Sequence, residues 1–266
     1  MKFKFFFSSI FIFLLYGNLI AQNNNSEMEV VYKMNYIPDS LNTEKKISVD
    51  NLVLLFNNDT SIYFSQDAKT YYDYLTKGIS TMQNGKISLG TLPPYPRSRA
   101  SVYKHGEVIT ATLPVGKYFY SFEEPKLEWI LLNEKSVING TNCNLAKTIT
   151  DTGDTFFAWY SMEYPFSEGP FRFKGLPGLI LKVYNKNKTI EIEAIGIKKA
   201  VLPIEPFMTA SSIKIKNKNI YLKTRAEYNE NPNIQNMNTG IIVKKDGVLL
   251  DNNTGMKKIT TNVFLD

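Results

Sequence analysis

The chain of 266 residues carries a formal net charge of +6, is 43% hydrophobic, and contains one cysteine and one histidine. A single thiol cannot close an internal disulfide, and one cysteine with one histidine cannot supply the usual ligands of a zinc site. The sequence has no Walker loop and no dinucleotide fingerprint, so we expect no metal and no cofactor. The basic side chains are scattered among acidic ones, which argues against a nucleic-acid partner.

The first 21 residues have the pattern of a secretory signal peptide. Lys2 and Lys4 precede an apolar run, and Ala21 places a small residue where a signal peptidase cuts. The run is short for a transmembrane helix, which needs about 20 apolar residues, although an uncleaved anchor is the alternative. No cysteine follows the cut to carry a lipid, which argues against a lipoprotein. We expect an exported protein, periplasmic or at the cell surface, with no stable membrane span after cleavage and a single domain over residues 22–266.

The first part of this domain is typical of β-strands followed by one helix. Residues 29–36 alternate apolar and more polar side chains, which predicts a half-buried strand. A polar turn between the apolar runs 51–56 and 61–65 predicts a hairpin. Residues 66–77 predict a short helix, and the prolines within 78–99 indicate an irregular connection.

From residue 102 onward, short β-type segments recur at the spacing of an antiparallel sheet. Residues 219–230 predict a second helix that ends at Asn231-Pro232. We therefore expect a mainly β fold, β-rich α+β, with a curved antiparallel sheet that forms an open or partial barrel and with one or two short helices. The predicted strands are 102–104, 107–113, 118–123, 128–132, 135–138, 143–149, 155–160, 179–184 and 189–197, followed by a small hairpin over 241–243 and 248–250 or an extended tail.

Residues 169–181 contain a predicted turn that requires particular residue types, followed by an apolar strand. Pro177 fixes φ at the second position of a type II turn, and Gly178 accepts the positive φ that the third position requires. The near-continuous apolar run that follows predicts a strand buried on both faces. The predicted structural motif consists of Gly175, Leu176, Pro177, Gly178, Leu179 and Ile180.

Several motifs taken together resemble one family. They are Trp129-Ile130-Leu131, residues 135–140, Cys143, Ala158-Trp159-Tyr160 and the run from Tyr164 to Ile180. Over residues 127–185 the chain resembles the GLPGLI family of secreted Bacteroidetes proteins, a Porphyromonas-type family. Thr141-Asn142 departs from the pattern, since these proteins often have an aromatic residue just before the cysteine. The resemblance implies an exported β-rich envelope protein that accompanies an outer-membrane receptor system, and it implies no defined reaction.

Nucleophilic catalysis would require Cys143 and His105 to meet. Cys143 lies in a predicted strand without a basic neighbour in the sequence, so a buried, inert thiol is the simpler interpretation. His105 precedes a glycine and is typical of a turn residue. We assign no catalytic residue, and an envelope hydrolase that uses Cys143 or a carboxylate pair is the alternative.

Acidic residues could form two further kinds of site, a calcium site and a hydrolytic carboxylate pair. Asp151 and Asp154 flank a glycine turn and could bind calcium, but the regular EF-hand loop is missing and a plain turn is simpler. Sequence fixes no distance between the acids that could form a hydrolytic pair. These acids are Glu123, Glu124, Glu128 and Glu163, of which Glu123 and Glu124 are expected at a solvated strand end.

Aromatic side chains crowd into the segment before the predicted turn. A curved sheet can enclose an apolar ligand between its concave face and a covering helix or loop, although core packing explains the same residues. Arg172 and Lys174 could orient an anionic group beside that mouth, or lie solvated. We expect a non-catalytic protein that binds an unknown apolar ligand or a protein partner; a structural or assembly role is a further alternative. The candidate ligand-binding residues are Tyr164, Phe166, Phe171, Arg172, Phe173 and Lys174.

Overall fold

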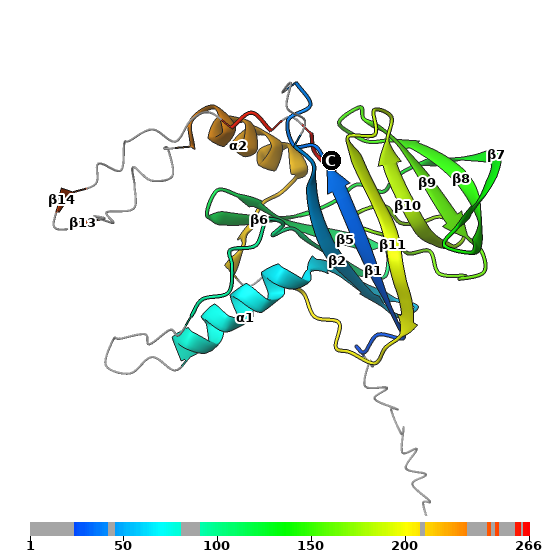
Figure 1. Cartoon of the computed structure of the whole chain (residues 1–266), viewed down its shortest axis with the longest axis horizontal. Coiled ribbons are helices and arrows are strands. Elements are labelled where there is room, and N and C mark those ends of the chain that lie inside the picture. Colours follow the sequence, from blue (N-terminus) through cyan, green and yellow to red (C-terminus); the bar gives the residue numbers. More distant parts are fainter. Residues whose placement is uncertain are drawn as a thin grey trace, which may run out of the picture.

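The computed structural model describes residues 24–41, 46–80, 91–207, 211–232, 244–245, 248–249, 259–261 and 263–266 (Figure 1). The predicted signal peptide and residues 241–243 of the predicted hairpin lie outside the described residues. Among the described helices, none is long and apolar enough to cross a membrane.

Twelve strands form one sheet, in the order β12-β6-β5-β4-β3-β2-β1-β11-β10-β9-β8-β7. All neighbours pair antiparallel except β12 with β6. The strands are β1 (Met28–Tyr36), β2 (Ser48–Phe56), β3 (Thr60–Ser65), β4 (Ser101–His105), β5 (Val108–Val115), β6 (Tyr118–Glu123), β7 (Trp129–Ile138), β8 (Thr141–Ile149), β9 (Thr155–Ser161), β10 (Leu179–Asn185), β11 (Ile190–Lys199) and β12 (Ile213–Lys214). A separate two-stranded sheet pairs β13 (Lys244–Lys245) with β14 (Val248–Leu249).

The sheet is two meanders joined where β1 pairs with β11, and it curls strongly. Strands β6 and β7 are ten positions apart, which would be about 48 Å across a flat sheet. Only residues 124–128 connect them, and such a segment spans roughly 20 Å when fully extended. The two ends of the sheet therefore approach each other, and the result is an open, curved sheet rather than a closed barrel.

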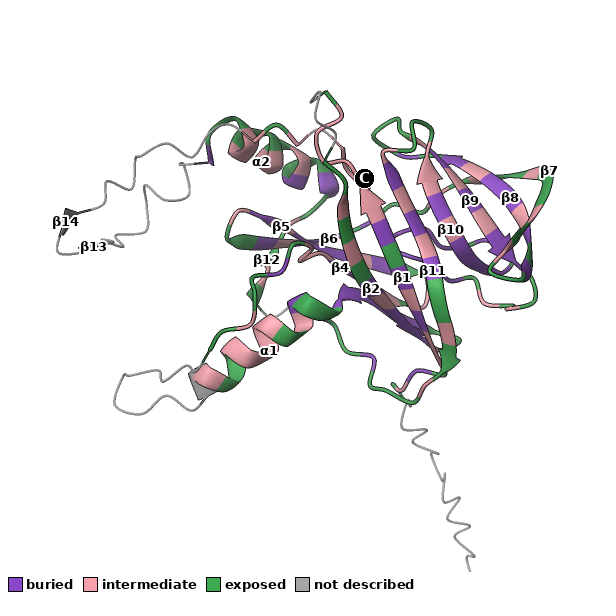
Figure 2. Ribbon diagram, in the orientation of Figure 1, coloured by how far each residue is buried: buried purple, intermediate pink, exposed green. Residues whose placement is uncertain are grey.

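The main core lies on the concave face, where alternate residues of each strand point. Val30, Tyr32 and Met34 of β1 are buried in this way, and the Tyr32 hydroxyl donates a hydrogen bond of 2.7 Å to the carbonyl of Ile180. Helix α2 (Lys218–Glu230) adds Tyr221 to the same core and contacts β5 and β6. Figure 2 shows the buried residues alternating along these strands.

A smaller core lies on the opposite, convex face. Leu55, Ile62 and Phe64 pack there with Ile204, and helix α1 (Gln66–Ser80) contacts β2 and β3. Ser65 starts this helix, because its hydroxyl accepts a 3.3 Å hydrogen bond from the backbone N–H of Ala68. The two helices thus lie on different faces of the sheet, and α2 covers the concave one.

The sequence-based fold class is confirmed, with small shifts at the element ends. The two strands predicted over 128–132 and 135–138 are one strand, β7, whose register is interrupted between Leu131 and Lys135. The predicted helices are α1 and α2, and α1 continues through the first residues of the segment expected to be irregular. Strand β10 is buried on both faces as predicted, since Leu179, Ile180 and Leu181 are all inaccessible.

The predicted type II turn at residues 176–179 is wrong. Gly178 does not have a positive φ, and the N–H of Leu179 donates to the carbonyl of Tyr164 at 2.9 Å instead of closing a turn. Glycine is needed for a different reason: a Cβ on Gly178 would lie 2.3 Å from the carbonyl oxygen of Ser161. The positive φ occurs earlier, at Gly175 (+93°).

Candidate functional site

The loop between β9 and β10, residues 162–178, contains all six candidate ligand-binding residues. The structure divides them into two groups. Arg172, Lys174, Phe171 and Phe173 are buried, whereas Tyr164 and Phe166 are partly exposed.

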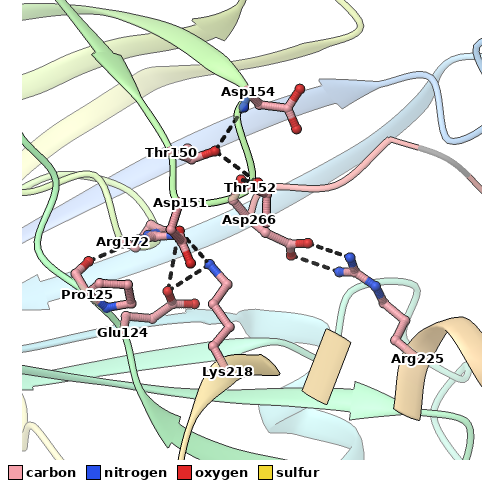
Figure 3. Close-up of polar contacts among 10 residues, drawn as sticks. All are labelled: Glu124, Pro125, Thr150, Asp151, Thr152, Asp154, Arg172, Lys218, Arg225 and Asp266. Carbon is pink, nitrogen blue, oxygen red and sulfur yellow. Dashed lines mark hydrogen bonds and ion pairs between the residues drawn. The ribbon is translucent and has the colours of Figure 1, made fainter. Parts of the chain in front are cut away.

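Arg172 lies in a buried ionic cluster and is not solvated (Figure 3). Its Nη1 lies 2.6 Å from Asp151 Oδ1 and 3.1 Å from Glu124 Oε2, and its Nη2 donates to the carbonyl of Pro125 at 2.9 Å. The Nζ of Lys218, in the first turn of α2, lies 3.0 Å from both acids. The cluster therefore ties the β6–β7 connection, the β8–β9 turn, the loop and α2 together. The expectation of a solvated Glu124 is also wrong, because the strand end is covered by this cluster.

Burial and ion pairing act in opposite directions on the two acids of the cluster. Burial raises the pKa of Glu124 despite the attraction of Arg172 and Lys218. Burial opposes ionisation of Asp151 as well, but hydrogen bonds from Arg172 and Lys218 outweigh it and lower the pKa of Asp151. The four charged groups pair with one another, although Glu124 Oε1 and Arg172 Nε are buried without a hydrogen-bond partner among the described residues. The cluster has the character of a structural ion-pair network.

A second buried cluster holds Lys174. Its Nζ lies 2.5 Å from Glu168 Oε2 and donates to the carbonyl of Gly169 at 3.1 Å, while Lys104 of β4 lies 2.8 Å from Glu168 Oε1. Burial lowers the pKa of Lys174, whereas the two lysines outweigh burial at Glu168 and lower its pKa. Neither Arg172 nor Lys174 is solvated as a lone charge, so the expectation of solvated side chains is wrong for both.

The buried aromatic residues of the loop differ in what they face. Phe173 packs in the core against Phe156, with ring centroids 4.8 Å apart. Phe171 is only 2% exposed, has a left-handed backbone (φ +52°) that is uncommon for an aromatic residue, and lines a cavity. Such a conformation costs free energy and persists only where the surroundings fix it, as the neighbouring Arg172 cluster does here.

Tyr164 and Phe166 line an open cleft of about 950 Å³ at the start of β1 and the end of β11. The Phe166 ring packs edge-on against Phe56 at 5.0 Å, which anchors one wall. Many of the remaining lining residues are polar, with Asn24, Asn58 and Glu27 among them, although most of the exposed lining surface is apolar. This cleft is wide, and it is as open to solvent as the smaller space described next, so openness does not distinguish the two as binding sites.

A smaller cavity of about 290 Å³ lies on the concave face, beneath α2. Aromatic and aliphatic side chains form most of its wall, and arginines and acids are placed among them. The residues used in the argument below are Met34, Asp50, Ala100, Phe171, Tyr221 and Arg225. We call this space the concave-face cavity; its volume is at the lower end of the roughly 300–1,000 Å³ of small-molecule sites, and its mixed lining resembles theirs.

Asp50 is the unusual group in this lining. Its Oδ2 is buried and has no hydrogen-bond partner among the described residues. Burial raises the pKa of Asp50, against a smaller opposing attraction from Arg97. A buried acceptor without a partner costs about 1–3 kcal/mol, so a donor brought by a ligand would be favourable here.

Sequence reasoning missed this cavity because its walls come from distant segments. Asp50 lies one residue before the start of the strand predicted at 51–56, and nothing in the local pattern distinguishes it from a solvated acid. The other walls of the same cavity include residues of α2 and residues 263–266, more than 160 residues later in the chain. The general expectation of a ligand space between the concave face and a covering helix is the nearest sequence-based signal.

The residues considered for thiol catalysis lie in different meanders. Cys143 is buried in β8, its Sγ donates to the carbonyl of Thr141 at 3.5 Å, and burial raises its pKa to about 11. His105 ends β4, where its Nδ1 lies 3.3 Å from Asp59 Oδ2. The thiolate is therefore disfavoured, and the described side-chain contacts of His105 are with Asp59 and Thr60.

Three of the acids considered for hydrolysis or metal binding, Glu124, Asp151 and Glu163, pair with other groups. Glu163 accepts hydrogen bonds from the backbone and side-chain nitrogens of Asn142, each at 3.0 Å. Asp151 belongs to the Arg172 cluster, and the backbone N–H of Asp154 donates to Thr150. Within the described parts of the chain, no group of three potential metal ligands comes together.

Comparison with known proteins gives a family relation over part of the chain. Residues 122–182 match the sequence profile of a family described as "Protein of unknown function (Porph_ging)". This match supports a relation to a Porphyromonas-type family. It spans the β6 end, both partners Glu124 and Arg172, and the start of β10. No curated protein matches the chain.

Several solved structures align with much of the chain at low sequence identity. One structure of PNGF-II aligns with a TM-score of 0.49 at 15% identity, covering 76% of this chain and 33% of that chain. The chain thus spans about a third of the length of PNGF-II. An uncharacterised conserved protein from Thermus thermophilus aligns with a TM-score of 0.36 at 5% identity, over 72% of this chain and 91% of that one.

Proposed function

We propose that this protein is an exported, non-catalytic binding protein whose concave-face cavity holds a small ligand with an apolar body and a hydrogen-bond donor. The observation that carries the proposal is Asp50 Oδ2, a buried acceptor without a described partner in the wall of a cavity lined by aromatic rings. An ammonium, hydroxyl or amide on the ligand would provide the missing donor. The apolar wall would supply most of the affinity, at about 25 cal/mol for each Å² removed from water.

The strain at Phe171 supports the same site. Loops that serve only as connections have little reason to hold an aromatic residue at positive φ, whereas functional sites often contain such residues. The Arg172 cluster holds the backbone on the C-terminal side of Phe171 and so presents its ring to the cavity. Under this proposal the ionic clusters shape the site and do not contact the ligand.

The proposal also includes the cellular location of the protein and its family. The signal-like residues 1–21 support export, to the periplasm or the cell surface, and the run from Tyr164 to Ile180 supports a place among GLPGLI-type proteins of Bacteroidetes. A role as an accessory to an outer-membrane receptor system follows from that resemblance. Mass spectrometry of the intact protein from its own cell envelope tests the first point directly, since a processed chain begins after Ala21.

Two probes of the same shape test the binding site. Phenethylamine carries an ammonium, and 2-phenylethanol carries a neutral hydroxyl; calorimetry or NMR titration measures their dissociation constants. We expect phenethylamine to bind the wild-type protein and Asp50→Asn to weaken it at least tenfold, because a charge-assisted hydrogen bond is lost. Ala100→Leu, which fills the cavity, should abolish binding of both probes.

Tyr164→Ala is the matched control, because Tyr164 lines the open cleft and not the concave-face cavity. It should leave both dissociation constants unchanged. If Tyr164→Ala removes binding while Ala100→Leu retains it, the cleft is the site and the proposal is wrong. If neither probe binds and native mass spectrometry of the envelope-purified protein finds no retained molecule, a structural role replaces it.

A further inference from the structure

Residues 263–266, which we call the tail segment, lie along the concave-face cavity. Arg225 of α2 binds the side-chain carboxylate of Asp266 with both ends of its guanidinium: Nη1 donates to Oδ1 at 2.8 Å and Nη2 donates to Oδ2 (Figure 3). Both side chains are largely buried, at 15% and 7% exposed. This is the two-pronged geometry by which arginine selects carboxylates.

Aromatic rings complete the surroundings of Arg225. The Phe264 ring lies 3.6 Å from the guanidinium carbon and the Tyr221 ring lies 5.3 Å from it. A guanidinium over an aromatic face is favourable, and the rings also shield the charge from water. Arg225 and Tyr221 thus form a subsite for a carboxylate that carries an apolar group, and the Phe264 ring occupies the place of that apolar group.

The tail segment is not part of a helix or strand, and its described backbone attachments are few. The N–H of Val263 donates to the carbonyl of Pro38 at 3.3 Å, and the hydroxyl of Thr152 donates to the carbonyl of Asp266 at 2.9 Å. Local openings cost least where a segment has few such bonds. Val263 and Leu265 also pack against the main core, so release of the tail segment would break these contacts and the Arg225 pair but no strand pairing of the sheet.

We propose that Arg225 is a carboxylate-binding residue and that the tail segment is an internal competitor for an apolar carboxylate ligand. The inference rests on the proposed function of the cavity and adds a second polar subsite to the cavity, at Arg225. Asp266 occupies the place of the ligand carboxylate, and Phe264 with Leu265 occupies part of the apolar space. An attached occupant competes at high effective concentration, so an external carboxylate binds weakly until the tail segment is released.

The test uses 3-phenylpropionate, a carboxylate of the same shape as phenethylamine. Asp266→Asn keeps the size of the side chain but removes its charge, so the tail segment is released more easily while Arg225 stays available. We expect the dissociation constant of 3-phenylpropionate to fall at least tenfold in this variant. Arg225→Met should remove binding, and Arg225→Lys should weaken it because the two-pronged contact is lost.

Asp266→Asn and Arg225→Met break the same ion pair, but the first should strengthen binding of 3-phenylpropionate and the second should remove it. These opposite effects on binding are the decisive readout. A purely structural pair predicts that Asp266→Asn and Arg225→Met both destabilise the fold and that neither improves binding. Glu107→Gln, which breaks an exposed pair with Lys126, is the control and should change no dissociation constant. Arg225→Lys keeps the test informative if Arg225→Met does not fold.

The outcomes separate this inference from the proposed function. If Asp266→Asn leaves 3-phenylpropionate binding unchanged while phenethylamine still binds in an Asp50-dependent way, the tail segment is structural and only this inference fails. If neither probe binds any variant, both fail.

Discussion

Arg172 and Glu124 form an ion pair inside the protein, with 3.1 Å between Nη1 and Oε2 and with both side chains almost fully buried. Glu124 begins the short connection between the two meanders, and Arg172 lies in the loop that precedes β10. The pair therefore lies where the two ends of the curved sheet approach each other. Arg172 of the conspicuous segment 169–181 serves this closure, while Gly169 and Gly178 allow the close approach of backbones.

Arg172→Met should destabilise the protein by about 3–5 kcal/mol, because Glu124 would keep a buried charge with a lost partner. Urea unfolding followed by tryptophan fluorescence measures the change in the free energy of unfolding. Lys126→Met is the control, since it breaks an exposed pair with Glu107 that is worth at most about 1 kcal/mol. If Arg172→Met lowers the free energy of unfolding by less than about 1 kcal/mol, the cluster does not hold the two ends of the sheet together.

Gly178→Ala should destabilise strongly, because its Cβ would lie 2.3 Å from the carbonyl oxygen of Ser161 and 2.7 Å from its carbonyl carbon. Both atoms belong to the backbone, so relief requires β9 and β10 to separate. Gly196→Ala is the matched control: it also lies in the sheet, and its Cβ would meet nothing within 4 Å. Equal melting temperatures for the two variants would contradict the close-packing explanation.

The contrast between these glycines shows what the sequence could and could not reveal. Strand positions followed from alternation, as at residues 29–36, because one face of each strand is buried and the pattern is local. The role of Gly178 was missed, since a close approach to Ser161 depends on how two strands pack and not on the local dipeptide. Arg172 and Lys174 look like ordinary surface charges in sequence, because the fold and not the local pattern brings them to their acidic partners. For the candidate cavity, the sequence predicts only a ligand space between the concave face and a covering helix or loop, and not the residues that line it.

Asp50→Asn should raise stability at neutral pH. Burial raises the pKa of Asp50 in the folded protein, so the folded state favours the protonated form more than the unfolded state does. The ionised carboxylate therefore reduces stability above its folded pKa, and this penalty disappears as the pH falls below the ordinary value near 3.8. The gain from the substitution should be present at about pH 7 and shrink toward about pH 3, measured by urea unfolding at each pH.

Glu107→Gln is the control for the pH experiment. Its hydrogen bond with Lys126 lowers the pKa of Glu107, which is the opposite direction, so the substitution should give no gain at neutral pH. A gain for Asp50→Asn that persists unchanged in acid would mean that packing rather than ionisation explains it.

Cys143 should react slowly with iodoacetamide in the folded protein. The thiolate is the reactive form, and burial both raises the pKa of Cys143 to about 11 and blocks access, since the side chain is 2% exposed. As the only cysteine in the sequence, it allows mass spectrometry to follow one modification site. Labelling at about pH 8 should accelerate by roughly a hundredfold or more when denaturant unfolds the chain, in parallel with the loss of native fluorescence. Rapid labelling of the folded protein would instead reveal an accessible, activated thiol and would favour the hydrolase alternative over a binding protein.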